Sequence, residues 1–95
     1  MFSINGKIQF IYNNTSKQVE YVFNNHAGVP MFSFTDKRGY HHQFIKVYGT
    51  KWKSYCNKEP NWPEDFLMVL YASFELEFQV IYNIHKNALH GISGL

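Results

Sequence analysis

The sequence of 95 residues contains only one cysteine, Cys56. Small secreted domains are usually held together by an even number of cysteines paired in disulfides. A lone thiol therefore argues against a disulfide-stabilised extracellular domain and favours a reducing compartment. The N-terminal segment MFSINGKIQF is interrupted by Asn5, Gly6 and Lys7, so it lacks the apolar block of a signal peptide. We expect a cytoplasmic protein.

Long hydrophobic runs are also missing. The longest is FLMVLYA at residues 66–72, whereas a membrane-spanning helix needs about 20 apolar residues. We therefore expect no membrane partner. The chain has no repeat, low-complexity run or linker, and its length suits one unit, so we predict a single domain over residues 1–95.

Metal and cofactor motifs are absent as well. The sequence contains no HExxH and no paired Cys/His spacing. His41 and His42 are adjacent, so on a strand they point to opposite faces. His85 and His90 are five residues apart and would not converge on one helix face. We expect no metal and no cofactor, and we interpret Cys56 as a structural thiol.

Acidic residues are scarce in the first half of the chain, and basic residues are scarce in the second half. Residues 1–58 hold eight Lys and Arg against Glu20 and Asp36, whereas residues 59–95 hold Lys86 against five acids. The net charge is only +2, but its uneven distribution makes the molecule a dipole that can steer encounters.

Aromatic residues, in contrast, are abundant, with nine Phe, seven Tyr and two Trp. A small core cannot bury all eighteen, because each carries roughly 150–250 Å² of surface. Some aromatic side chains are therefore expected to face water, a ligand or a partner.

The first half of the chain has the alternating pattern of strands. Residues 7–13, 18–24, 31–35 and 40–48 alternate in β-branched and aromatic residues, and the connectors NTSK and DKRG have turn chemistry. Asn5-Gly6 is the preferred pair of a tight hairpin turn, so a short first strand can precede these four. Residues 49–62 contain Pro60 and are predicted to be irregular.

The second half predicts a helix that begins at NWPEDF, because Pro63 suits a first turn and two acids follow it. Phe66, Leu70, Phe74, Phe78 and Ile81 recur at helical spacing, a polar stripe comprises Glu75, Gln79, Asn83 and Lys86, and Gly91 can cap the C-terminus. The predicted fold is α+β: a four- or five-stranded antiparallel meander sheet followed by one long C-terminal helix on one face. The alternative is a short helix at 63–72 and a further strand at 73–83, because SFELEFQVIYN also alternates.

The stretch from Gly39 to Tyr55 contains no acid and is rich in lysine and aromatic residues. On the strand, His42, Phe44, Lys46 and Tyr48 share one face, and a lysine is awkward inside a core. We therefore predict that this face is open and that Ile45 and Val47 form the buried side. Partner binding is predicted for the following residues: Arg38, Tyr40, His42, Phe44, Lys46, Tyr48, Lys51, Trp52, Lys53, Tyr55 and Trp62.

These features favour a small non-enzymatic binding protein that docks on a larger cytosolic protein or nucleoprotein. Residue usage indicates AT-rich coding, and in length and coding the chain is similar, in type only, to small phage or mobile-element inhibitors of host systems such as anti-CRISPR proteins. That similarity involves no specific residues. A meander leaves exposed strand edges, so a homodimer is a linked prediction.

Two other functions are compatible with the same residues. Basic side chains beside aromatic rings are the usual means of binding single-stranded nucleic acid, so a nucleic-acid-binding hairpin is the alternative. A small ribonuclease is the third, with His41 or His42 as acid or base and Arg38 and Lys46 as cations for the phosphate.

Overall fold

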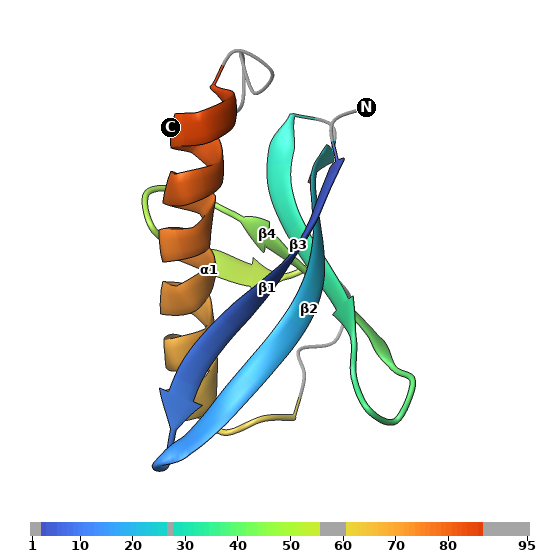
Figure 1. The fold of residues 1–95 in the computed structure, drawn as a ribbon, viewed down its shortest axis with the longest axis vertical. Helices are drawn as coiled ribbons and strands as arrows, with labels where there is room; N and C mark the ends of the chain where they lie inside the picture. The colour runs from blue at the N-terminus through green and yellow to red at the C-terminus, as the bar shows by residue number, and fades with distance from the viewer. Residues whose placement is uncertain (1–2, 27, 56–60, 87–95) are drawn as a thin grey trace.

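A computed structural model describes residues 3–26, 28–55 and 61–86. Figure 1 shows a twisted sheet whose concave side holds one long helix. The elements are β1 (Ser3–Tyr12), β2 (Thr15–His26), β3 (Val29–Thr35), β4 (His41–Lys46), β5 (Trp52–Ser54) and α1 (Glu64–His85).

The five strands pair in the order β1-β2-β3-β4-β5, each antiparallel to the next. The helix packs against both edge strands, β1 and β5, and so spans the sheet (Figure 1). The predicted fold is therefore confirmed in its five-stranded form. The alternative is wrong, because residues 73–83 lie within α1 rather than in a sixth strand.

The helix begins where the sequence predicted. Pro63 occupies the cap position, and its carbonyl accepts a hydrogen bond from the Leu67 amide at 3.1 Å. Glu64 and Asp65 lie in the first turn, where carboxylates complement the helix dipole. The predicted cap at Gly91 lies outside the described residues, as does Cys56.

Two of the predicted boundaries are wrong. The predicted irregular segment at 49–62 contains β5, which is short but pairs with β4 over three residues. Asn5-Gly6 is not a turn: it lies inside β1, and the hairpin turn is formed by Asn13 and Asn14. Both asparagines have positive φ angles, 51° and 60°, which asparagine tolerates better than most residues and which two-residue hairpin turns require.

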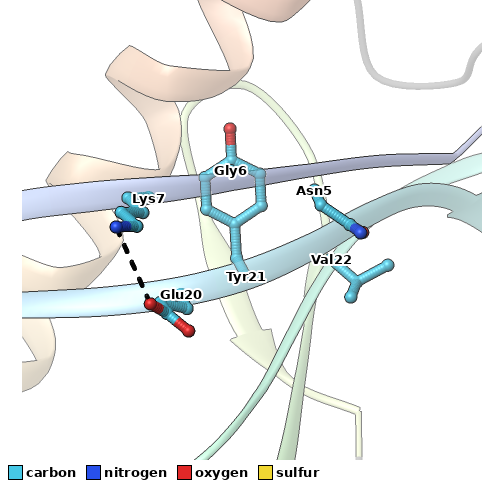
Figure 2. A pocket seen from close by; sticks show the side chains of 6 residues that line it. All are labelled: Asn5, Gly6, Lys7, Glu20, Tyr21 and Val22. Carbon is cyan, nitrogen blue, oxygen red and sulfur yellow. Dashed lines mark ion pairs between the residues drawn. The ribbon is translucent and has the colours of Figure 1, made fainter.

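Gly6 has a different purpose, because it makes room for a tyrosine. Gly6 pairs with Tyr21 across β1 and β2, and the Tyr21 ring lies against its backbone (Figure 2). A Cβ atom at Gly6 would lie 2.4 Å from the Tyr21 hydroxyl and 2.6 Å from its Cζ. This close approach lets the hydroxyl donate to Glu77 Oε2 on α1 at 2.5 Å, which ties the hairpin to the helix.

Gly6→Ala should therefore lower the free energy of unfolding by about 1–3 kcal/mol, the usual cost of overpacking. The ring has to move, and its hydrogen bond to Glu77 is lost. Urea unfolding measures the effect, and Asn5→Ala on the neighbouring exposed position is the control. The double variant Gly6→Ala with Tyr21→Val should lose less free energy of unfolding than the sum of the two single losses, because the ring that clashes with the new methyl group is gone. Fully additive losses would contradict the contact.

The core lies between the concave side of the sheet and α1, and it is mostly aromatic. Phe32 stacks on Phe74 with ring centroids 4.8 Å apart, and Phe44 and Trp52 contact the same Phe74 ring. Leu70, Phe74, Phe78 and Ile81 are the buried helix residues, as the helical spacing predicted. The buried core comprises Ile8, Tyr21, Phe23, Phe32, Phe44, Trp52, Leu70, Phe74, Phe78 and Ile81.

Candidate binding surface

The hairpin of β4 and β5 has two sides, and the structure reverses the predicted assignment. Phe44, Lys46 and Trp52 face the helix and are only 0%, 4% and 5% exposed. Val47 is exposed and Ile45 half-buried on the opposite side. The predicted open face is thus a core face, and the buried residues Phe44, Lys46 and Trp52 cannot reach a partner of the folded protein.

A lysine is tolerated on this buried side because it forms an ion pair with a carboxylate. Lys46 Nζ lies 2.6 Å from Glu75 Oε1 on α1, and it also donates to the carbonyl of Gly49. Trp52 Nε1 donates to the same carboxylate oxygen at 2.9 Å, and Gln79 Nε2 donates to the other oxygen at 2.7 Å. We call these four side chains, Lys46, Trp52, Glu75 and Gln79, the Lys46 cluster.

The aromatic core completes the surroundings of the ammonium group. Lys46 Nζ lies 5.7 Å from the centre of the Trp52 ring and 5.1 Å from that of Phe78, distances typical of cation–π contacts. The two hydrogen bonds and the two ring contacts of this buried cation are therefore all made to groups of the protein itself. Lys46 is consequently not placed to receive a phosphate, which the ribonuclease hypothesis needs.

The Lys46 cluster determines the ionisation of Glu75. Burial alone would raise the pKa of the Glu75 carboxyl, but hydrogen bonds from Lys46, Gln79 and Trp52 outweigh burial and hold the pKa below its ordinary value of 4.5. The side chain is therefore a carboxylate in the folded protein at neutral pH.

The loop between β3 and β4 is organised by Asp36. Its Oδ1 atom accepts hydrogen bonds from the backbone amides of Arg38 and Tyr40 at 2.9 and 3.0 Å, and Gly39 adopts a φ of 90° to complete the turn. His42 Nε2 donates to the other oxygen, Oδ2, at 2.9 Å. The hydrogen bond from His42, reinforced by the backbone amides, lowers the pKa of Asp36 below its ordinary value of 3.8.

Stability is therefore expected to fall in acid. Because the folded-state pKa values of Glu75 and Asp36 lie below their unfolded values, the stabilisation is complete above the unfolded pKa. It decreases as the pH falls below about 5 and is lost once the pH passes below the folded-state values. Urea midpoints at pH 7 and pH 3 measure this loss. Glu75→Gln should show a smaller difference between the two pH values, and an unchanged difference would contradict the assignment.

Trp62 belongs to the core side as well, although it was predicted as a partner-binding residue. It is half-buried, and its ring lies 4.7 Å from that of His42 and 5.4 Å from that of Phe66. His42 is also half-buried, between Trp62, Phe34 and Asp36. These two residues anchor the segment before α1 to the sheet.

The remaining predicted residues lie on the opposite side of the hairpin and in the loops at the two ends of β4. Alternation places His41 and Val47 of the β4 segment, and Lys53 and Tyr55 of the β5 segment, away from the helix. The exposed loops at the two ends of β4 contribute Lys37, Arg38 and Tyr40 at one end and Tyr48 and Lys51 at the other. We call this set the basic aromatic surface: Lys37, Arg38, Tyr40, His41, Val47, Tyr48, Lys51, Lys53 and Tyr55.

The cations of this surface have no carboxylate partner in the part of the chain that the structure describes. Lys37, Arg38, Lys51 and Lys53 form no ion pair with any residue that the structure describes. Two of them lie over tyrosines instead: Arg38 is 5.2 Å from the centre of the Tyr40 ring, and Lys51 Nζ is 5.3 Å from that of Tyr48. Tyr40 and Tyr48 nevertheless remain 61% and 62% exposed.

Of the predicted partner-binding residues, the structure thus leaves six exposed on the hairpin and on the loops at the ends of β4: Arg38, Tyr40, Tyr48, Lys51, Lys53 and Tyr55. It separates them from His42, Phe44, Lys46, Trp52 and Trp62, which face the helix side. Lys37, His41 and Val47 also belong to the basic aromatic surface, although they were not predicted as partner-binding residues. The β4 alternation contained the signal for His41 and Val47, but it was assigned to the wrong face.

Two other surface regions are the β1–β2 hairpin and the outward side of α1. A shallow pocket of about 450 Å³ on the β1–β2 hairpin is lined by Asn5, Gly6, Lys7, Glu20, Tyr21 and Val22 (Figure 2). Lys7 and Glu20 pair within it at 3.8 Å. The outward side of α1 exposes Met68, Leu76, Val80 and Ile84. Self-association through this helix or through a strand edge stays a prediction.

Within residues 3–26, 28–55 and 61–86, no three His, Cys, Asp or Glu side chains gather as a metal ion would require. In the same part of the chain, no helix is both long enough and apolar enough to cross a bilayer.

Comparison with known proteins provides no further information: no protein-family profile, curated protein sequence or solved structure matches this chain.

Proposed function

We propose that this protein is a small non-enzymatic binding protein that docks on a larger cytosolic protein or nucleoprotein through the basic aromatic surface. One observation carries the proposal. Four exposed cations that form no ion pair among the described residues lie together with three exposed tyrosines on the β4–β5 hairpin and the loops at the ends of β4.

The chemistry of these side chains indicates the kind of partner. Arginine and tyrosine are enriched among residues that dominate binding energies. An exposed cation attracts a negatively charged group, and a tyrosine ring beside it adds apolar contact area. A partner that presents acidic groups next to flat or apolar groups would satisfy both. We therefore propose an acidic docking site on the partner.

From the AT-rich coding, we further propose that this protein is a phage or mobile-element inhibitor and that its partner belongs to a host system. An inhibitor of this kind needs only to cover a site on its target. A preformed, exposed surface on a rigid hairpin is suited to that task, because little ordering is required on binding.

The proposal is tested by charge reversal with matched net charge. The variant Lys51→Glu with Lys53→Glu changes the basic aromatic surface, whereas Lys17→Glu with Lys86→Glu changes exposed lysines elsewhere. Retention on immobilised heparin, a polyanion, is measured as the salt concentration of elution. We expect a markedly larger decrease for the Lys51/Lys53 variant. Equal decreases for the two variants would contradict the proposal, since only net charge would then matter.

A further inference from the structure

We infer, on the basis of the proposed function, that the group held by the basic aromatic surface is a single-stranded nucleic acid. The strand would contact the two loops at the ends of β4, Arg38–Tyr40 and Tyr48–Lys51, and the outward side chains of β5. The inference concerns the class of partner, and it therefore can fail while the proposed docking function remains valid.

The first argument is the order of side chains along β5. Register places Lys53 beside Ile45, and Tyr55 donates its amide to Gln43. Lys53 and Tyr55 alternate with the buried residues Trp52 and Ser54, so both point away from the helix. A cation and an aromatic ring thus follow one another along the β5 edge.

The second argument is the pairing of cations with rings at both ends. Arg38 over Tyr40 and Lys51 over Tyr48 each combine a charge for a phosphate with a ring on which a base can stack. Both rings are more than half exposed although a cation lies over them. An extended nucleotide chain is a partner that offers phosphates and planar groups in alternation.

The third argument is the position of the acidic residues. Most of the described carboxylates lie on α1, which packs on the other side of the sheet. Glu75 is held by Lys46, and Glu77 accepts the hydroxyl of Tyr21. Asp36 is occupied by His42 and by two loop amides. The described carboxylates of the acidic half therefore all belong to α1.

The same features disfavour a duplex and a purely acidic peptide. Bases of a duplex are stacked inside and cannot reach exposed tyrosine rings, whereas single strands present their bases for stacking. A run of glutamates offers charge but no planar groups. Stacking on Tyr40 and Tyr48 is therefore the property that separates a single strand from other polyanions.

The experiment is a fluorescence anisotropy titration with a labelled 12-nucleotide oligo-dT, with its blunt duplex, heparin and polyglutamate as competitors. We expect oligo-dT to bind better than the duplex, and log affinity to fall with log salt at a slope of about −2 for three contacted phosphates. Tyr40→Ser and Tyr48→Ser should each weaken binding on the order of tenfold, as loss of one stacking platform does. Both sites are exposed, and circular dichroism verifies that the variants fold.

Two other outcomes overturn the inference in distinguishable ways. If heparin or polyglutamate binds in a Lys51- and Lys53-dependent manner while the tyrosine variants are unaffected, the partner is an acidic protein surface and the docking function stands. If none of these polyanions is bound at low salt, both the inference and the proposed function are wrong.

Discussion

Glu75→Ala should lower the free energy of unfolding by about 3–5 kcal/mol, the usual cost of removing one partner of a buried ion pair. Lys46 is only 4% exposed, so without Glu75 its ammonium group keeps the Gly49 carbonyl but has no carboxylate beside it. Trp52 Nε1 also loses its acceptor. Urea unfolding followed by circular dichroism at low temperature measures the loss.

The double variant Lys46→Met with Glu75→Leu separates charge from packing. Replacing a buried pair by apolar residues of similar volume is often neutral or stabilising, so this variant should recover most of the stability lost by Glu75→Ala. Recovery also keeps the test informative if the single variant does not fold. A loss below about 1 kcal/mol for Glu75→Ala, typical of exposed ion pairs, would show that the pair is open to solvent.

Phe74→Ala is expected to cost a further large amount, about 3–5 kcal/mol, because it leaves a cavity in the centre of the core. The Phe74 ring contacts Phe32, Phe44 and Trp52, so its removal affects three strands at once. Thermal and urea unfolding both report this change.

Leu76→Ala is the matched control on the same helix. Leu76 is 71% exposed, and its truncation should change stability by less than about 0.5 kcal/mol. The pair also tests the secondary structure, because a strand would place Phe74 and Leu76 on one face. Similar costs for the two variants would contradict the helix.

Secondary structure was largely predictable from periodicity in this chain. Phe66, Leu70, Phe74, Phe78 and Ile81 predicted the helix face that packs on the sheet, although SFELEFQVIYN was equally compatible with a strand. The start signals around Pro63 favoured the helix, and the structure agrees. In contrast, Asn5-Gly6 resembled a turn because the sequence cannot show Tyr21 lying across the neighbouring strand.

The faces of β4 were not predictable, because alternation identifies two sides but not which one is buried. The charge of Lys46 led to the wrong assignment, because a lysine usually faces solvent. Its carboxylate partner Glu75 lies 29 residues away in the sequence, on α1. Glu75 was placed on a polar stripe, although it is half-buried in the Lys46 cluster. Charges distant in sequence can be paired only once the fold is known.

The hairpin from Gly39 to Tyr55 has two sides of different character. Its inner side, with Phe44, Lys46 and Trp52, contacts the helix and the core. Its outer side exposes His41, Val47 and Lys53. A binding surface supported by a rigid core keeps its side chains positioned before a partner arrives, which lowers the ordering cost of binding.

The most direct test of the proposed binding role is backbone amide chemical-shift mapping of the 15N-labelled protein titrated with unlabelled oligo-dT at low salt. Our account predicts that the shift changes cluster on residues 37–41, 47–48, 51, 53 and 55, while the Lys46 cluster and α1 change little. Changes concentrated on α1 or on the β1–β2 hairpin, or no change at all at millimolar oligonucleotide, would contradict it.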